Sequence, residues 1–108
     1  MQRGEIWWAE MEKPVGRRPV LILSRNASVQ VREAVIVAQV TTHARHIPSE
    51  VPLHKQDGMP KECVVNLDVL YTLPKKELVL RITELNLDKQ QYVDKTLKYV
   101  LGLSSCPN

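Results

Sequence analysis

The chain is a succession of short apolar segments, separated every few residues by proline, glycine, asparagine or charged side chains. The segments are rich in β-branched residues, a pattern typical of β-strands. They predict seven strands, at residues 5–11, 20–24, 34–41, 50–53, 63–67, 69–73 and 78–83. Seven short strands in 108 residues favour a mainly β fold, a small twisted barrel or sandwich.

Only the segment after these strands has the period of an α-helix. Its apolar residues recur at helical spacing in Val93, Leu97, Val100 and Leu101. Asn86 precedes them as a suitable N-cap, and Gly102 follows as a residue that commonly ends a helix. We therefore expect one C-terminal α-helix packed on the sheet.

The length and composition are those of one globular domain, and we treat residues 1–108 as a single domain. No apolar run approaches the length that spans a bilayer, and Glu5 and Glu10 interrupt the N-terminal segment. We expect a cytoplasmic protein without a signal peptide or membrane contact. Cys63 and Cys106 have neither metal-ligand spacing nor the density of a disulfide scaffold; we interpret Cys63 as core and Cys106 as incidental.

Positive charge is concentrated in one part of the chain. Residues 13–49 contain six basic residues and one acid, Glu33, although the formal net charge of the whole chain is only +3. Such asymmetry within a domain favours one basic face and an anionic partner, most often nucleic acid. Solvated loops of a basic protein would give the same count.

Two arginines directly precede a predicted strand in the stretch GRRPVLILS, residues 16–24. Pro19 has a fixed φ and favours an extended conformation for Arg18, so the arginine side chain leaves the backbone in a restricted direction. The stretch predicts either an oriented charge at the edge of the strand or an ordinary solvated strand end.

Five segments follow one another in a recognisable order: RGEIW, GRRPVLILS, VAQVT, VVNLDVLYTL and RITEL. Together, over residues 3–103, they resemble the MazF/PemK family of toxin endoribonucleases from bacterial toxin-antitoxin systems. The resemblance implies an SH3-like β-barrel with a C-terminal helix, a homodimer, and sequence-specific cleavage of single-stranded RNA such as mRNA. It also implies that no metal ion or other cofactor takes part.

By motif position, the resemblance implies that Arg18 and Thr41 are the catalytic residues. The implied reaction is attack of a ribose 2′-OH on the adjacent phosphate, which leaves a 2′,3′-cyclic phosphate or a 3′-phosphate and a 5′-OH. A guanidinium beside a hydroxyl can stabilise the charge on the non-bridging oxygens. Arginine is a poor general base and histidine a good one, so the group that transfers protons, Arg18 or His43, stays open.

Further contacts to RNA are expected from Arg17, Thr42, His43 and Arg45. The two arginines flank the expected site and would meet phosphates, whereas a solvated loop is the simpler interpretation of His43. Trp7 and Trp8 are adjacent and should face opposite sides of their strand. The outward one would pack in the core or a dimer interface, or stack on a base.

An unrestrained ribonuclease would damage the cell that makes it. We therefore expect a cognate antitoxin whose acidic, disordered C-terminal segment orders along the basic face. Two other functions stay open: a toxin of the related fold that inhibits DNA gyrase by binding, and a nucleic-acid-binding barrel with an inactive site. The presence of both Arg18 and Thr41 favours the nuclease.

Overall fold

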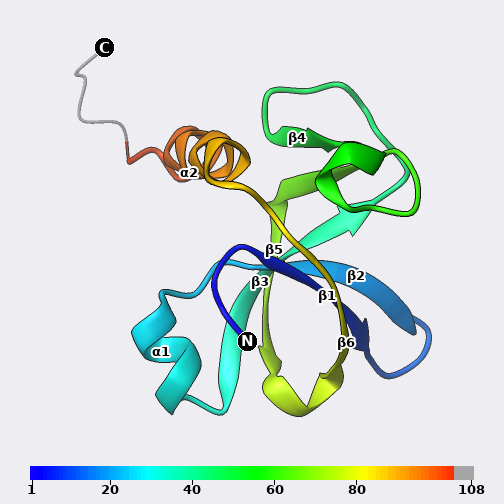
Figure 1. Ribbon diagram of the computed structural model, residues 1–108, viewed down its shortest axis with the longest axis vertical. Coiled ribbons are helices and arrows are strands. Elements are labelled where there is room, and N and C mark those ends of the chain that lie inside the picture. The colour runs from blue at the N-terminus through cyan, green and yellow to red at the C-terminus, as the bar shows by residue number, and fades with distance from the viewer. Residues whose placement is uncertain (104–108) are drawn as a thin grey trace.

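The computed structural model describes residues 1–103, so Cys106 lies outside the described residues. Its centre is one antiparallel sheet that curls into a half-barrel (Figure 1). The strands are β1 (Glu5–Glu10), β2 (Arg17–Ile22), β3 (Ala34–Thr41), β4 (Glu50–Leu53), β5 (Cys63–Pro74) and β6 (Leu78–Glu84), in the spatial order β4-β5-β3-β2-β1-β6. The predicted mainly β fold is confirmed.

The predicted C-terminal helix is also confirmed, as α2 (Leu87–Leu101). The Asn86 side chain accepts a hydrogen bond from the backbone N–H of Lys89 at 2.8 Å, and Gly102 ends the helix in the left-handed conformation with φ 68°. Two 3-10 turns, Lys55–Asp57 and Lys75–Glu77, lie in the connections. No helix within residues 1–103 is long and apolar enough to cross a bilayer.

One helix was not predicted. α1 (Asn26–Val31) has six residues and buries only Val29, so it is too short to show an apolar period in the sequence. It lies beside β3, away from α2 (Figure 1).

The prediction of seven strands is wrong by one. Residues 63–67 and 69–73 belong to the single strand β5, and Asp68 does not end it. The pairing of β5 with β3 shifts at this point, because Ala38 pairs with Leu70 whereas Gln39 pairs with Asn66. Such a bulge bends a strand without breaking it, which helps the sheet to curl.

β2 begins earlier than predicted, at Arg17 rather than Val20. Arg18 pairs with Ala9 and Arg17 with Glu10 of β1, so both arginines lie within the hairpin instead of before it. The six-residue connection 11–16 brings the strands together, and Gly16 at φ 70° allows the turn. Both guanidinium groups are therefore attached to paired, regular backbone.

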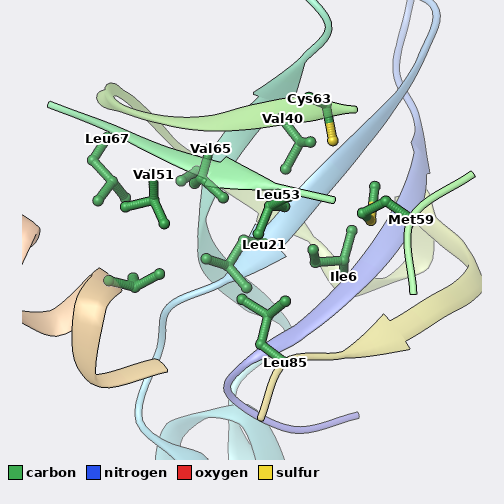
Figure 2. Packing of buried hydrophobic residues seen from close by; sticks show 12 residues of the cluster. Ile6, Leu21, Val40, Val51, Leu53, Met59, Cys63, Val65, Leu67 and Leu85 are labelled. Carbon is green, nitrogen blue, oxygen red and sulfur yellow. The ribbon is translucent and has the colours of Figure 1, made fainter. Parts of the chain in front are cut away.

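Both faces of the sheet are covered, and each has its own cluster of buried side chains. One cluster joins β1–β5 to α2 and includes Ile6, Leu21 and Val93. Figure 2 shows these side chains converging from different strands, with Cys63 and Met59 at one margin. The other cluster includes Val20, Ile22 and Val29 of α1. Val20 and Ile22 point into this second cluster, and Leu21 between them points into the first. Such alternation is typical of a strand that is buried on both faces.

Glu5 is a nearly buried carboxylate beneath the first hairpin. Its burial would raise the pKa, but hydrogen bonds from Trp7 Nε1 and the backbone N–H of Gln2, together with the positive N-terminus and Arg81, lower the pKa below its ordinary value of 4.5. Arg81 Nε lies 3.2 Å from Glu5 Oε2. The charged form is therefore favoured in the folded protein.

We expect Glu5→Gln to lower the free energy of unfolding at pH 7 by about 1 kcal/mol. Because the folded-state pKa of Glu5 is depressed, its contribution is present above the unfolded pKa and is lost as pH falls through the folded pKa. Urea unfolding at neutral and acidic pH should show the difference between variant and wild type shrinking in acid. Glu84→Gln is the control, because it removes a half-exposed partner of the same Arg81. It should lower the free energy of unfolding by less than Glu5→Gln does. Equal stability of Glu5→Gln and wild type at pH 7 would contradict this account.

Candidate functional site

A pocket of about 200 Å³ lies between the β1–β2 hairpin, the end of β3 and the segment before β5. Its walls are Trp8, Arg17, Arg18, Pro19, Val40, Thr41, Thr42, Met59, Pro60, Lys61 and Cys63. Four of the predicted site residues, Arg17, Arg18, Thr41 and Thr42, therefore meet in one place. They come from two separate segments that the pairing of β2 with β3 brings together.

Arg18 is held at one end of its guanidinium group. Its Nε donates a hydrogen bond to the backbone oxygen of Val15 at 3.3 Å, across the β1–β2 connection. Within residues 1–103, its two Nη atoms have no hydrogen-bond or ion-pair partner. The contact with Val15 orients the guanidinium, and its remaining donors are available for an anion in the pocket.

Arg17 lies against Trp8. Its guanidinium carbon is 4.9 Å from the centroid of the Trp8 ring, which is a cation–π contact. Trp7 packs against the opposite cluster and donates from Nε1 to Glu5, so the two tryptophans do face different sides. Trp8 is the one in the pocket, and its ring restricts where the Arg17 charge can move.

Thr41 ends β3 and starts the connection to β4. Its Oγ1 accepts a hydrogen bond from the backbone N–H of His43 at 3.1 Å, a local turn that fixes the hydroxyl. Because Oγ1 is the acceptor in this contact, the hydroxyl hydrogen remains free to donate. The half-buried Thr41 thus presents a fixed donor to the pocket.

His43 and Arg45 are not among the residues that line this pocket in the described part of the chain. Arg45 is tied elsewhere: its backbone N–H donates to Glu50 Oε1 at 2.9 Å, and its Nε lies 3.7 Å from Glu50 Oε2. The Glu50 side chain is only 2% exposed. The half-exposed Arg45 side chain is thus held at the 42–49 connection, and RNA contacts of Arg45 and His43 outside this pocket stay a prediction.

The sequence reasoning missed Lys61, which adds a third positive charge to the pocket wall. The only signal was its position two residues before the strand that begins at Cys63, and that was too little to place it beside Arg18. The basic residues Arg25 and Arg32, by contrast, flank the two ends of α1 and do not line the pocket. Of the basic residues in the segment 13–49, Arg17 and Arg18 are therefore the two that line this pocket among the residues described.

Cys63 is buried at the pocket wall, as predicted for a core residue. Burial, followed by the negative charges of Asp57 and Glu62, raises the pKa of its thiol to about 11. A thiol with such a pKa stays protonated at neutral pH and is a poor nucleophile. The polar side chains of the pocket are thus three cations and the hydroxyls of Thr41 and Thr42, and no carboxylate lines it among residues 1–103.

Comparison with known proteins places the chain in a family. The sequence model of PemK-like, MazF-like toxins of type II toxin-antitoxin systems matches residues 2–101. The probable endoribonuclease MazF5 of Mycobacterium tuberculosis (strain H37Rv) is 42% identical over 84 residues, which cover 77% of this chain and 76% of the relative. The probable endoribonuclease MazF2 of M. tuberculosis (strain CDC 1551) is 37% identical over 103 residues, 94% of this chain and 99% of the relative.

Solved structures show the same fold. A mycobacterial endoribonuclease in complex with its cognate antitoxin superimposes with a TM-score of 0.88 at 28% identity, over 98% of this chain and 99% of that one. MazF in a MazE–MazF complex from Deinococcus radiodurans gives a TM-score of 0.80 at 28% identity, over 96% and 97%. The family match over nearly the whole chain and the shared fold agree. This chain belongs to the PemK-like, MazF-like toxin family of type II toxin-antitoxin systems.

Proposed function

We propose that this toxin is an endoribonuclease that cuts single-stranded RNA in the pocket formed by β2 and the end of β3. The observation that carries the proposal is the lining itself: Arg17, Arg18 and Lys61 line the same pocket as Thr41, and no carboxylate among residues 1–103 lines it to repel a phosphate. The names of the relatives as endoribonucleases support the same reaction. mRNA is the substrate class that we infer, and the cytoplasm is where the toxin would meet it.

The reaction that suits these groups starts from the RNA itself. The 2′-oxygen attacks the adjacent phosphorus and gives its proton to a base, for which Arg18 and His43 are the two candidates. The bond from phosphorus to the 5′-oxygen breaks, and that oxygen takes up a proton in turn. The products are a 2′,3′-cyclic phosphate and a 5′-OH, and later hydrolysis would give the 3′-phosphate. Charge develops on the non-bridging oxygens, where the free donors of Arg18 and the Thr41 hydroxyl would stabilise it. Arg17 and Lys61 would hold the flanking phosphates.

Cleavage in excess EDTA tests this reaction. We expect the purified protein to cut a single-stranded RNA without a divalent metal ion, because every group in the proposed reaction belongs to the chain or the RNA. A 2′-deoxy nucleotide on the 5′ side of the scissile phosphate should abolish cleavage at that position alone, since the nucleophile is missing. A substrate cut equally well with the deoxy nucleotide, or a requirement for Mg²⁺, would contradict the mechanism. Absence of cleavage under all conditions would favour a gyrase inhibitor or a non-catalytic barrel.

Two partners complete the proposal. The relatives solved with a cognate antitoxin or with MazE support an antitoxin for this chain, with an acidic, disordered C-terminal segment that would order over Arg17, Arg18 and Lys61. We also propose a homodimer. The exposed apolar residues of β6 and α2 offer surface for it: Val79, Leu80, Leu87, Tyr92, Tyr99 and Leu101.

A further inference from the structure

A second cavity of about 400 Å³ adjoins the first, and Thr42 and Cys63 line both. It lies between the 42–49 connection and the start of β5, at the edge formed by β4. An RNA strand whose phosphate occupies the first pocket has to pass over one of its walls. Thr42 and Cys63 form the wall shared by the two cavities, so a strand that passes over this wall would reach the second cavity.

Two polar side chains face each other in this second cavity. His54 Nδ1 lies 2.8 Å from Glu62 Oε2, and the side chains are 39% and 76% exposed. The contact leaves Glu62 Oε1 without a hydrogen-bond partner among residues 1–103. A carboxylate with a free oxygen is an acceptor for the amino groups of nucleic-acid bases.

The turn that holds His54 is tied to the rest of the fold. The backbone N–H of His54 donates to Asp57 Oδ2 at 2.8 Å, and the backbone oxygen of Asp57 accepts from Thr83 Oγ1 at 3.0 Å. Gly58 ends the turn at φ 94°, and a Cβ there would collide with the Thr83 side chain. This side of the cavity is thus fixed against β6.

The opposite side of the cavity is fixed by Glu50. The backbone N–H of His46, another lining residue, donates to Glu50 Oε1 at 2.9 Å, beside the bond from Arg45. This contact holds His46 at φ 56°, a conformation that such a residue rarely adopts. The positions of His54 and His46 on the two walls are therefore set by the fold itself, which favours selective recognition.

We propose that this second cavity is a base-specificity subsite for the nucleotide next to the cleaved phosphate, in which the Glu62 carboxylate accepts a hydrogen bond from an exocyclic amino group. The proposal rests on the proposed endoribonuclease function. Adenine, cytosine and guanine carry such a group. Uracil instead has two carbonyl oxygens flanking its one N–H, and these repel a carboxylate. His54 positions Glu62 through their contact. The subsite thus favours the three amino-bearing bases over uracil.

Glu62→Gln tests the subsite, because it keeps the size of the side chain but replaces one acceptor oxygen with an amide N–H₂ group. This group can donate a hydrogen bond to a carbonyl oxygen of uracil. The assay is cleavage of a single-stranded RNA pool with random nucleotides, followed by sequencing of the new 5′-OH ends. Wild-type protein should disfavour uracil about tenfold at one position beside the cut. In Glu62→Gln this discrimination should fall to about twofold or reverse. Since Glu62 is exposed, the variant should fold normally, and its melting temperature provides the check.

Glu33→Gln is the matched control, because it removes the same charge from an exposed residue just before β3, at the end of the strand opposite Thr41. It should keep the wild-type base profile. An unchanged profile in Glu62→Gln, with cleavage intact, would overturn the subsite alone. A profile changed equally in Glu33→Gln would overturn it too, since net charge would then explain the effect. A wild-type protein that cuts no RNA would overturn the proposed function and the subsite with it.

Discussion

Arg18→Ala should lower the rate of RNA cleavage about a thousandfold while leaving the fold intact. The Arg18 side chain is exposed at the pocket, and its only hydrogen bond or ion pair within residues 1–103 is the one to Val15, so little stability depends on it. Its free Nη donors are the groups that would meet the developing charge on phosphate. The measurement is the single-turnover rate on a labelled RNA, with thermal melting to confirm folding.

Three further variants show which property of Arg18 is needed and whether the other arginines share its role. Arg18→Lys keeps the charge but lacks the planar fork that can hold two oxygens, so it should remain strongly impaired. Arg17→Ala should mainly weaken RNA binding, because Arg17 lies on Trp8 at the margin of the pocket. Arg32→Ala, which follows α1 and is exposed outside the pocket, should behave as wild type. Nearly full activity of Arg18→Lys would show that charge alone is needed at this position.

The fold was largely predictable because its strands are local features. The apolar segments at 34–41 and 50–53 coincide with β3 and β4, and the caps of α2 follow from Asn86 and Gly102. The continuity of β5 through Asp68 was not predictable, because a polar residue in a bulge resembles a polar residue in a turn. The early start of β2 depends on pairing with β1, which no local pattern in GRRP reveals.

The site was predictable only where a motif contains it. GRRP and VAQVT supplied Arg17, Arg18 and Thr41, and the sheet places them together. Lys61 enters the pocket through the fold of the 54–63 segment, which has no periodic pattern. Arg45, which is expected to contact RNA, also contacts the buried Glu50 five residues later, and the sequence did not predict this. Side-chain contacts of this kind are not visible in composition or spacing.

Thr41→Val should reduce cleavage about a hundredfold, whereas Thr41→Ser should stay within about tenfold of wild type. Valine keeps the branched shape that suits the end of β3 but removes the hydroxyl, and serine keeps the hydroxyl. In both wild type and Thr41→Ser, Oγ can accept from the His43 backbone N–H and still donate to a phosphate oxygen. The two variants therefore separate the hydrogen bond from the packing of the side chain.

The measurements for Thr41 are single-turnover rates together with affinity for an RNA that carries a 2′-deoxy nucleotide at the cleavage site. A hydroxyl that stabilises the transition state predicts a large loss of rate with little loss of affinity. A hydroxyl that only organises the 42–49 connection predicts weaker binding instead, through displaced Thr42. Thr72→Val, at an exposed position of β5 opposite Ile36, is the control and should change neither quantity. Full activity of Thr41→Val would remove Thr41 from the reaction and leave Arg18 as the group that meets the cleaved phosphate.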